Sequence, residues 1–69
     1  MISEKLLKEL NRQITAELWS ANLYLSMAYF MEHQGYPGFA QWLKMQSEEE
    51  RDHAKDFASY ILSRGREVI

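Results

Sequence analysis

Gly35-Tyr36-Pro37-Gly38 is the stretch that decides the fold, because it interrupts a sequence that otherwise favours helix from Ser3 to Gly65. Gly35 can adopt the left-handed conformation that ends many helices. Pro37 can open the next helix, since the first turn requires no backbone donor and the φ angle of proline is already fixed. The stretch therefore predicts a turn between two helices.

The outer ends of these helices are marked as well. Ser3 is a good N-cap residue, and Gly65 is placed to end the second helix. The sequence thus predicts helices over about residues 4–34 and 37–64. Two long helices joined by so short a turn predict an all-α fold, an antiparallel two-helix hairpin.

The composition excludes several classes of function. The chain has 69 residues, eight Lys+Arg, ten Asp+Glu and a formal net charge of −2, which predicts neither a nucleic acid nor an anionic membrane as a partner. The absence of cysteine excludes disulfides, zinc–thiolate sites and iron–sulfur clusters. The most apolar run, residues 21–31, is too short to span a bilayer, and the N-terminal residues do not form a signal sequence. We therefore expect a cytoplasmic protein.

Heptad spacing identifies the faces expected to pack together. The series in the first helix is Leu10, Ile14, Glu17, Ala21, Tyr24, Ala28 and Met31. The series in the second is Phe39, Leu43, Gln46, Glu50, His53, Phe57 and Tyr60. Pairing residues outward from the turn places Glu17 opposite residue 54, within about one helical turn of Glu50 and His53.

Glu17, Glu50 and His53 are therefore candidate metal ligands. Carboxylate oxygens and an imidazole nitrogen held on rigid helices are ligands that suit non-haem iron, and one Glu plus a Glu-x-x-His is half of the set found in di-iron bundles. Unpaired carboxylates beside apolar neighbours are costly, which favours a cation as their partner. The alternative is a hydrogen bond between Glu50 and His53 that fixes the helix register, with Glu17 on the surface.

Two further residues are candidates with ordinary alternatives. Glu49 can border the site and hold a further iron, or it can lie on a solvated helix face. Tyr24 can donate a hydrogen bond to a ligand carboxylate or supply an electron, or it can be a core tyrosine with a satisfied hydroxyl.

The first helix carries more apolar residues than one neighbouring helix can cover. Two flanks lie outside its heptad series: Leu7, Leu18 and Leu25 on one side, and Trp19, Leu23, Met27 and Phe30 on the other. An isolated hairpin would expose these residues, and so small a chain seldom maintains a core alone. We therefore expect the hairpin to be half of a four-helix bundle within a homo-oligomer.

Four segments resemble the N-terminal half of the prokaryotic non-haem ferritins, and the resemblance runs without gaps from Ile2 to Arg66. They are Asn11-Arg12-Gln13-Ile14-Thr15-Ala16-Glu17, Ser20-Ala21-Asn22-Leu23-Tyr24-Leu25, Gly38-Phe39-Ala40-Gln41-Trp42 and Gln46-Ser47-Glu48-Glu49-Glu50-Arg51-Asp52-His53-Ala54.

The resemblance implies a role for each candidate residue. It makes Glu17, Glu50 and His53 ligands of the first ferroxidase iron, with Glu50 bridging to a second iron. Tyr24 matches the tyrosine beside that centre, and Glu49 matches a ligand of an adjacent third iron site. Arg51 stands where haem-binding relatives carry an axial methionine, which argues against haem.

The implied function is iron storage with ferroxidase activity. Fe(II) would be oxidised to Fe(III) by dioxygen or peroxide at a carboxylate-bridged di-iron centre and stored inside a protein shell. The alternatives are a rubrerythrin-like di-iron peroxide reductase and a metal-free helical assembly module. Ferritins continue with further helices that supply the remaining ligands, so we expect residues 1–69 to be an incomplete domain lacking part of the centre. A fragment is favoured over a split chain, whose other half is separate, and over a two-helix variant that dimerises to rebuild the bundle.

Overall fold

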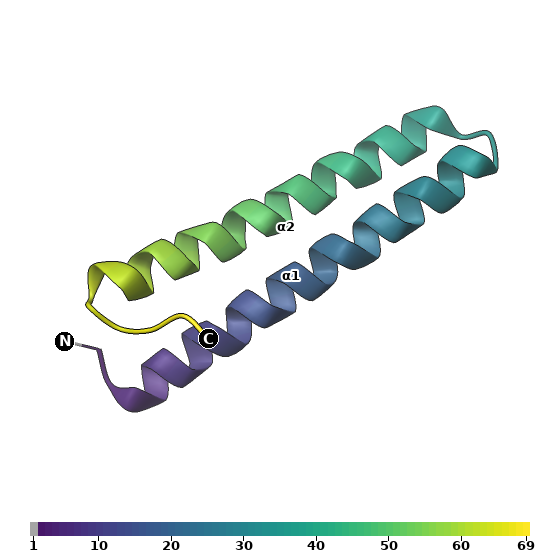
Figure 1. Ribbon diagram of the computed structural model, residues 1–69. Helices are drawn as coiled ribbons and strands as arrows, with labels where there is room; N and C mark the ends of the chain where they lie inside the picture. Colours follow the sequence, from purple (N-terminus) through teal and green to yellow (C-terminus); the bar gives the residue numbers. More distant parts are fainter. Residues whose placement is uncertain (1) are drawn as a thin grey trace.

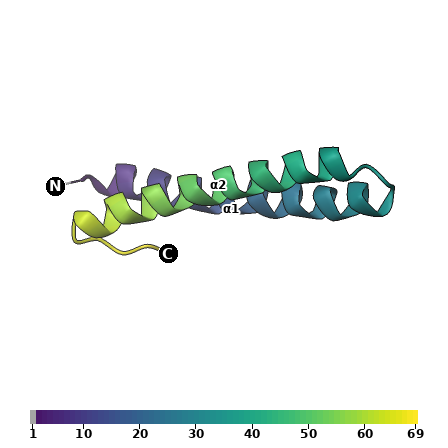
Figure 2. The ribbon, with the colours of Figure 1, turned by 90° about the horizontal axis from the view of Figure 1, so that it is seen from above.

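The computed structural model describes residues 2–69, which form two antiparallel helices joined by a tight turn (Figure 1). Helix α1 spans Glu4–His33 and helix α2 spans Pro37–Ser63. The hairpin measures 50 × 15 × 12 Å, and the two helices lie along each other for most of their length (Figure 2). Neither helix of the described chain offers a stretch both long and apolar enough to cross a membrane. The predicted all-α hairpin is confirmed, with each helix ending one residue before the position indicated by the sequence.

Local capping interactions explain where the helices begin and end. The Ser3 side chain accepts a hydrogen bond of 3.1 Å from the backbone N–H of Leu6. At the turn, Gly35 has a φ of 89°, and the N–H of Tyr36 donates to the carbonyl of Met31 at 3.0 Å. A left-handed residue followed by this long backward hydrogen bond is the pattern that satisfies the last carbonyls of a helix. Pro37 then begins α2.

Alanine substitutions at the two glycines of the turn are expected to change stability in opposite directions. Gly35→Ala should lower the free energy of unfolding by about 1 kcal/mol, because a side chain disfavours positive φ. Gly38→Ala should raise it by about 0.5 kcal/mol, since Gly38 lies in the first turn of α2 and an added Cβ meets no atom within 4 Å. Urea unfolding at one fixed protein concentration measures both. Equal effects would contradict this account of the turn.

Small side chains line the contact between the helices. The buried residues are Ile14, Ala21 and Ala28 in α1, and Ala40, Leu43, Ser47, Ala54 and Ile61 in α2. The buried Ser47 hydroxyl donates a hydrogen bond of 2.8 Å to the carbonyl of Ala21. Alanine and serine at these positions let the two backbones approach closely, so the contact is narrow.

The structure confirms the heptad series predicted for α1 and part of the one predicted for α2, in which Leu43 is buried and Gln46, Glu50 and Phe57 are half-buried. At the two ends of α2 the buried face is displaced by one residue, so Ala40 and Ile61 are buried while Phe39 and Tyr60 are 49% and 39% exposed. The prediction followed the aromatic residues, whereas the close approach of the helices selects the small residues beside them. Phe39 and Tyr60 lie on the flanks of the contact instead.

The residues after α2 fold back onto the start of α1 (Figure 1). Gly65 has a φ of 70°, which allows the reversal. The buried Asn11 then contacts the returning backbone twice: its Nδ2 donates to the carbonyl of Glu67 at 3.2 Å, and its Oδ1 accepts from the N–H of Ile69 at 2.9 Å. We call this pair of contacts, between Asn11 and residues 67 and 69, the tail clasp. An ion pair between Arg66 and Glu4 lies beside it.

Large apolar side chains remain exposed on both helices. Those on the predicted flanks of α1 include Leu18, Trp19, Leu23, Met27 and Phe30, whereas Leu7 and Leu25 are half-buried. Further exposed large apolar residues on α2 are Phe39, Trp42, Met45, Tyr60 and Leu62. Two helices therefore cover only part of the apolar surface that this sequence carries, as expected from its composition.

Candidate metal centre

Glu17, Glu50 and His53 come together near the middle of the hairpin. Glu17 is carried by α1, and Glu50 and His53 are carried by successive turns of α2. One potential ligand atom from each side chain lies within 4.8 Å of the others. His53 Nδ1 is 3.5 Å from Glu17 Oε2 and 3.9 Å from Glu50 Oε2. The structure thus juxtaposes the three residues as the antiparallel pairing predicts, and their role as iron ligands stays a prediction.

The three side chains differ in exposure. The Glu17 side chain is 14% exposed, that of Glu50 is 24% exposed and that of His53 is 54% exposed. His53 is more exposed than its place in the predicted heptad series indicates, because Ala54 takes the buried position in α2. The cluster is therefore shielded from solvent at Glu17 and accessible to solvent at His53.

One oxygen of Glu17 is held by a neighbour on the same helix, and the other has no hydrogen-bond partner. Gln13 Nε2 donates a hydrogen bond of 2.9 Å to Glu17 Oε1. Within the described residues, Glu17 Oε2 is buried and accepts no hydrogen bond. A buried carboxylate oxygen without a partner costs free energy, and a divalent cation between the three side chains would supply the partner. The donor set, two carboxylates and one imidazole, fits iron.

The two carboxyl groups perturb each other's protonation. The adjacent Glu50 carboxyl has the largest effect in lowering the pKa of Glu17, and Gln13 and His53 lower it further. The same contact raises the pKa of Glu50, and burial adds to that rise. A cation that binds both carboxylates must displace any proton that Glu50 holds, so cation binding and proton binding compete here.

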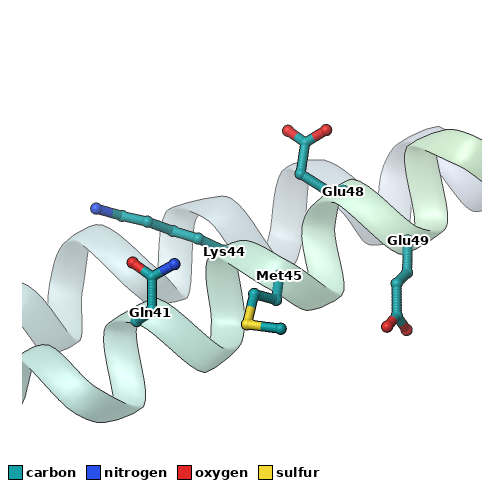
Figure 3. A pocket seen from close by; sticks show the side chains of 5 residues that line it. All are labelled: Gln41, Lys44, Met45, Glu48 and Glu49. Atoms are coloured by element: carbon teal, nitrogen blue, oxygen red, sulfur yellow. The ribbon is translucent and has the colours of Figure 1, made fainter.

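Tyr24 and Glu49 lie outside this cluster. Tyr24 is half-buried on α1, and no hydrogen bond in the described chain joins it to Glu17, Glu50 or His53. Glu49 is exposed on α2 and lines a shallow hollow together with Gln41, Lys44, Met45 and Glu48 (Figure 3). In that view Glu48 and Glu49 point in opposite directions. The expected parts of Tyr24 and Glu49 in iron chemistry stay predictions.

The sequence pattern did not indicate a functional role for Gln13. Its spacing of four residues from Glu17 was the available signal, because side chains at i and i+4 are neighbours on a helix surface. That spacing is common on helices, and only the observed hydrogen bond selects it here.

Comparisons with known proteins extend over the whole hairpin. Residues 7–69 match the ferritin-like domain family. A bacterial non-heme ferritin of Bacteroides fragilis is 57% identical over 65 residues, which are 94% of this chain and 41% of that protein. A bacterial non-heme ferritin of Staphylococcus epidermidis is 39% identical over 69 residues, which are 100% of this chain and 42% of that protein.

Solved structures agree with the sequence relatives. An open-pore ferritin from the hyperthermophilic archaeon Archaeoglobus fulgidus superposes with a TM-score of 0.94 at 45% identity, covering 100% of this chain and 43% of that chain. An engineered closed form of the same archaeal protein superposes with a TM-score of 0.95. The chain spans about two fifths of the length of the relatives that it matches.

Proposed function

This chain belongs to the ferritin family, and from that membership and the cluster of Glu17, Glu50 and His53 we propose that it serves iron storage with ferroxidase activity. Fe(II) is the substrate, and each ion loses one electron to dioxygen or peroxide at a carboxylate-bridged di-iron centre. The Fe(III) product is then stored in a protein shell. We expect the whole protein to be cytoplasmic, and the absence of cysteine from residues 1–69 is compatible with a reducing compartment.

The observation that carries this proposal is the unpartnered Glu17 Oε2, which lies 3.5 Å from His53 Nδ1 on the opposite helix. A metal-free network that only fixed helix register would be expected to satisfy its buried atoms. A cation site leaves such an oxygen without a hydrogen bond, so that the oxygen can bind the cation. The metal-free assembly module proposed as an alternative accounts less well for this atom.

Each residue of the cluster has a distinct task in the proposed reaction. Glu17 and His53 hold the first iron, through a carboxylate oxygen and a neutral imidazole nitrogen. Glu50 holds the same iron and bridges to a second one. Carboxylate oxygens are hard ligands that suit Fe(III), so they favour the oxidised product. Tyr24 supports the centre by a hydrogen bond or an electron, and Glu49 contributes to an adjacent third iron site.

We also propose that the protein acts as a homo-oligomer, shell-like where further helices complete the bundle. The support is the exposed apolar surface of α1, on which Trp19 is 66% exposed and Phe30 is 62% exposed. Surfaces of this kind on soluble chains are typical of interfaces.

Anaerobic Fe(II) titration of the chain, followed by admission of dioxygen, tests the function. The hairpin supplies one Glu and one Glu-x-x-His, which is half of a di-iron ligand set. We therefore expect weak binding of at most one iron per chain and negligible oxidation until further helices are added. Sedimentation in the same samples reports the oligomer. A chain that takes up no Fe(II) would contradict the proposal, and rapid oxidation would show that two hairpins complete the centre together.

A further inference from the structure

We propose that Gln13 is a positioning residue of this metal centre, which fixes the Glu17 carboxylate so that one oxygen alone is presented to iron. The inference rests on the proposed function and adds a residue outside the ligand set. Gln13 lies one helical turn before Glu17 on α1, and its Nε2 is 2.9 Å from Glu17 Oε1.

The hydrogen bond divides the two oxygens of Glu17 between two tasks. Oε1 accepts from the Gln13 amide, and the amide N–H group is not a metal ligand. Oε2 is buried, free of hydrogen bonds and directed at His53 Nδ1, 3.5 Å away. With Gln13 in place, Glu17 is held to bind a cation through Oε2 alone.

A neutral amide suits this task for two reasons. It immobilises a flexible side chain before the cation arrives, so less conformational entropy is lost on binding. It also donates a hydrogen bond without adding a positive charge, which lysine or arginine at the same position would bring close to the cation. Donors of this kind behind a ligand carboxylate orient it and tune its affinity for metal.

Glu50 is held differently from Glu17. No amide side chain donates to Glu50 in the described part of the chain, and the neighbouring Arg51 pairs with Glu48 at 3.6 Å instead. Glu50 is also more exposed, at 24% against 14% for Glu17. The structure therefore combines one fixed carboxylate with one that is free to reorient. A reorienting carboxylate suits the bridging position, where the ligand must adjust to a second iron.

Titration of the chain with Co(II), a redox-stable substitute for Fe(II), tests this assignment. Gln13→Met removes the donor while keeping the side-chain length, and Gln13→Ala removes it with a strong helix former. Both should weaken Co(II) binding by about 10-fold, as is typical when a group supporting a ligand is lost. Both should also lower the intensity of the visible Co(II) absorption, because Glu17 can then bind through both oxygens and raise the coordination number.

Two controls separate positioning from a general structural effect. Gln41→Met makes the same change at another exposed glutamine and should leave affinity and spectrum unchanged. Without metal, Gln41→Met should melt at the parental temperature and Gln13→Met at most slightly below it, because both side chains are exposed and Gln13 makes a single hydrogen bond.

The possible results distinguish this inference from the function on which it rests. Parental affinity and spectrum in Gln13→Met and Gln13→Ala, together with lost binding in Glu17→Gln, would overturn the role of Gln13 and leave the metal centre standing. An equal effect of Gln41→Met would also overturn it. A parental chain that binds neither Co(II) nor Fe(II) would overturn both proposals.

Discussion

Replacing Glu50 with alanine is expected to weaken Fe(II) binding by more than about 100-fold, beyond the loss usual for a residue that only supports a ligand. Glu50 contributes an oxygen beside both Glu17 and His53, and its proposed bridging role makes it the most sensitive of the three ligands. In an assembly completed by further helices, the rate of iron oxidation should fall together with the Fe(II) affinity. Anaerobic Fe(II) titration measures the first effect, and the rate of Fe(III) formation measures the second.

Glu48→Ala is the matched control for this change. Glu48 lies on the same helix but is exposed and pairs with Arg51, so its loss should leave Fe(II) affinity within experimental error. In the absence of metal, Glu50→Ala should unfold at the parental temperature or above it, because the contact between two carboxyl groups is removed. Parental iron binding in Glu50→Ala would show that the cluster is not the metal centre.

Leu43→Ala is expected to have the largest effect on stability, lowering the free energy of unfolding by about 3 kcal/mol. Leu43 is 1% exposed and is among the largest fully buried side chains of the described chain. Its truncation leaves a cavity in a contact lined largely by alanine and serine, whose short side chains cannot extend to fill it. Urea unfolding at one protein concentration measures the change, since association would make the midpoint depend on concentration.

Leu62→Ala makes the same substitution on the same helix at a side chain that is 62% exposed. It should change the free energy of unfolding by less than about 0.5 kcal/mol if Leu62 faces solvent. A loss equal to that of Leu43→Ala would contradict the burial order described for a single hairpin. It would instead place Leu62 within an interface of the oligomer.

The hairpin could be predicted from sequence because the signals that define it are local. Ser3 acts through a hydrogen bond to the first turn of α1. Gly35 and Pro37 act through their own φ angles, together with the backbone hydrogen bonds of the turn. The antiparallel course then follows from the short turn. It also places Glu17 level with Glu50 and His53, since helical rise and pairing direction determine which residues are neighbours.

Side-chain packing between the helices could not be predicted in the same way. The two ends of the α2 contact face were misplaced by one residue, because heptad spacing is compatible with both Phe39 and Ala40, whereas Leu43 was placed correctly. Only the distance between the two backbones decides between them. Gln13 was missed because its effect depends on a rotamer that reaches Glu17 Oε1. The tail clasp was missed because Asn11 and Glu67 are far apart in sequence, and no local pattern connects them.

The tail clasp has a consequence for the order in which the molecule folds. Contacts near the turn join residues close in sequence: Glu32 and Lys44 are 12 positions apart, and Ala21 and Ser47 are 26 apart. The clasp joins Asn11 to residues 56 and 58 positions away. Because closing a longer loop costs more entropy, we expect pairing to start at the turn and the clasp to form late.

A contact made after the transition state affects only the rate of unfolding. Asn11 therefore has little influence on how fast the hairpin folds. We expect Asn11→Ala to speed the release of residues 67–69 from α1, and with it the separation of the two helices that hold the Glu17–Glu50–His53 cluster together.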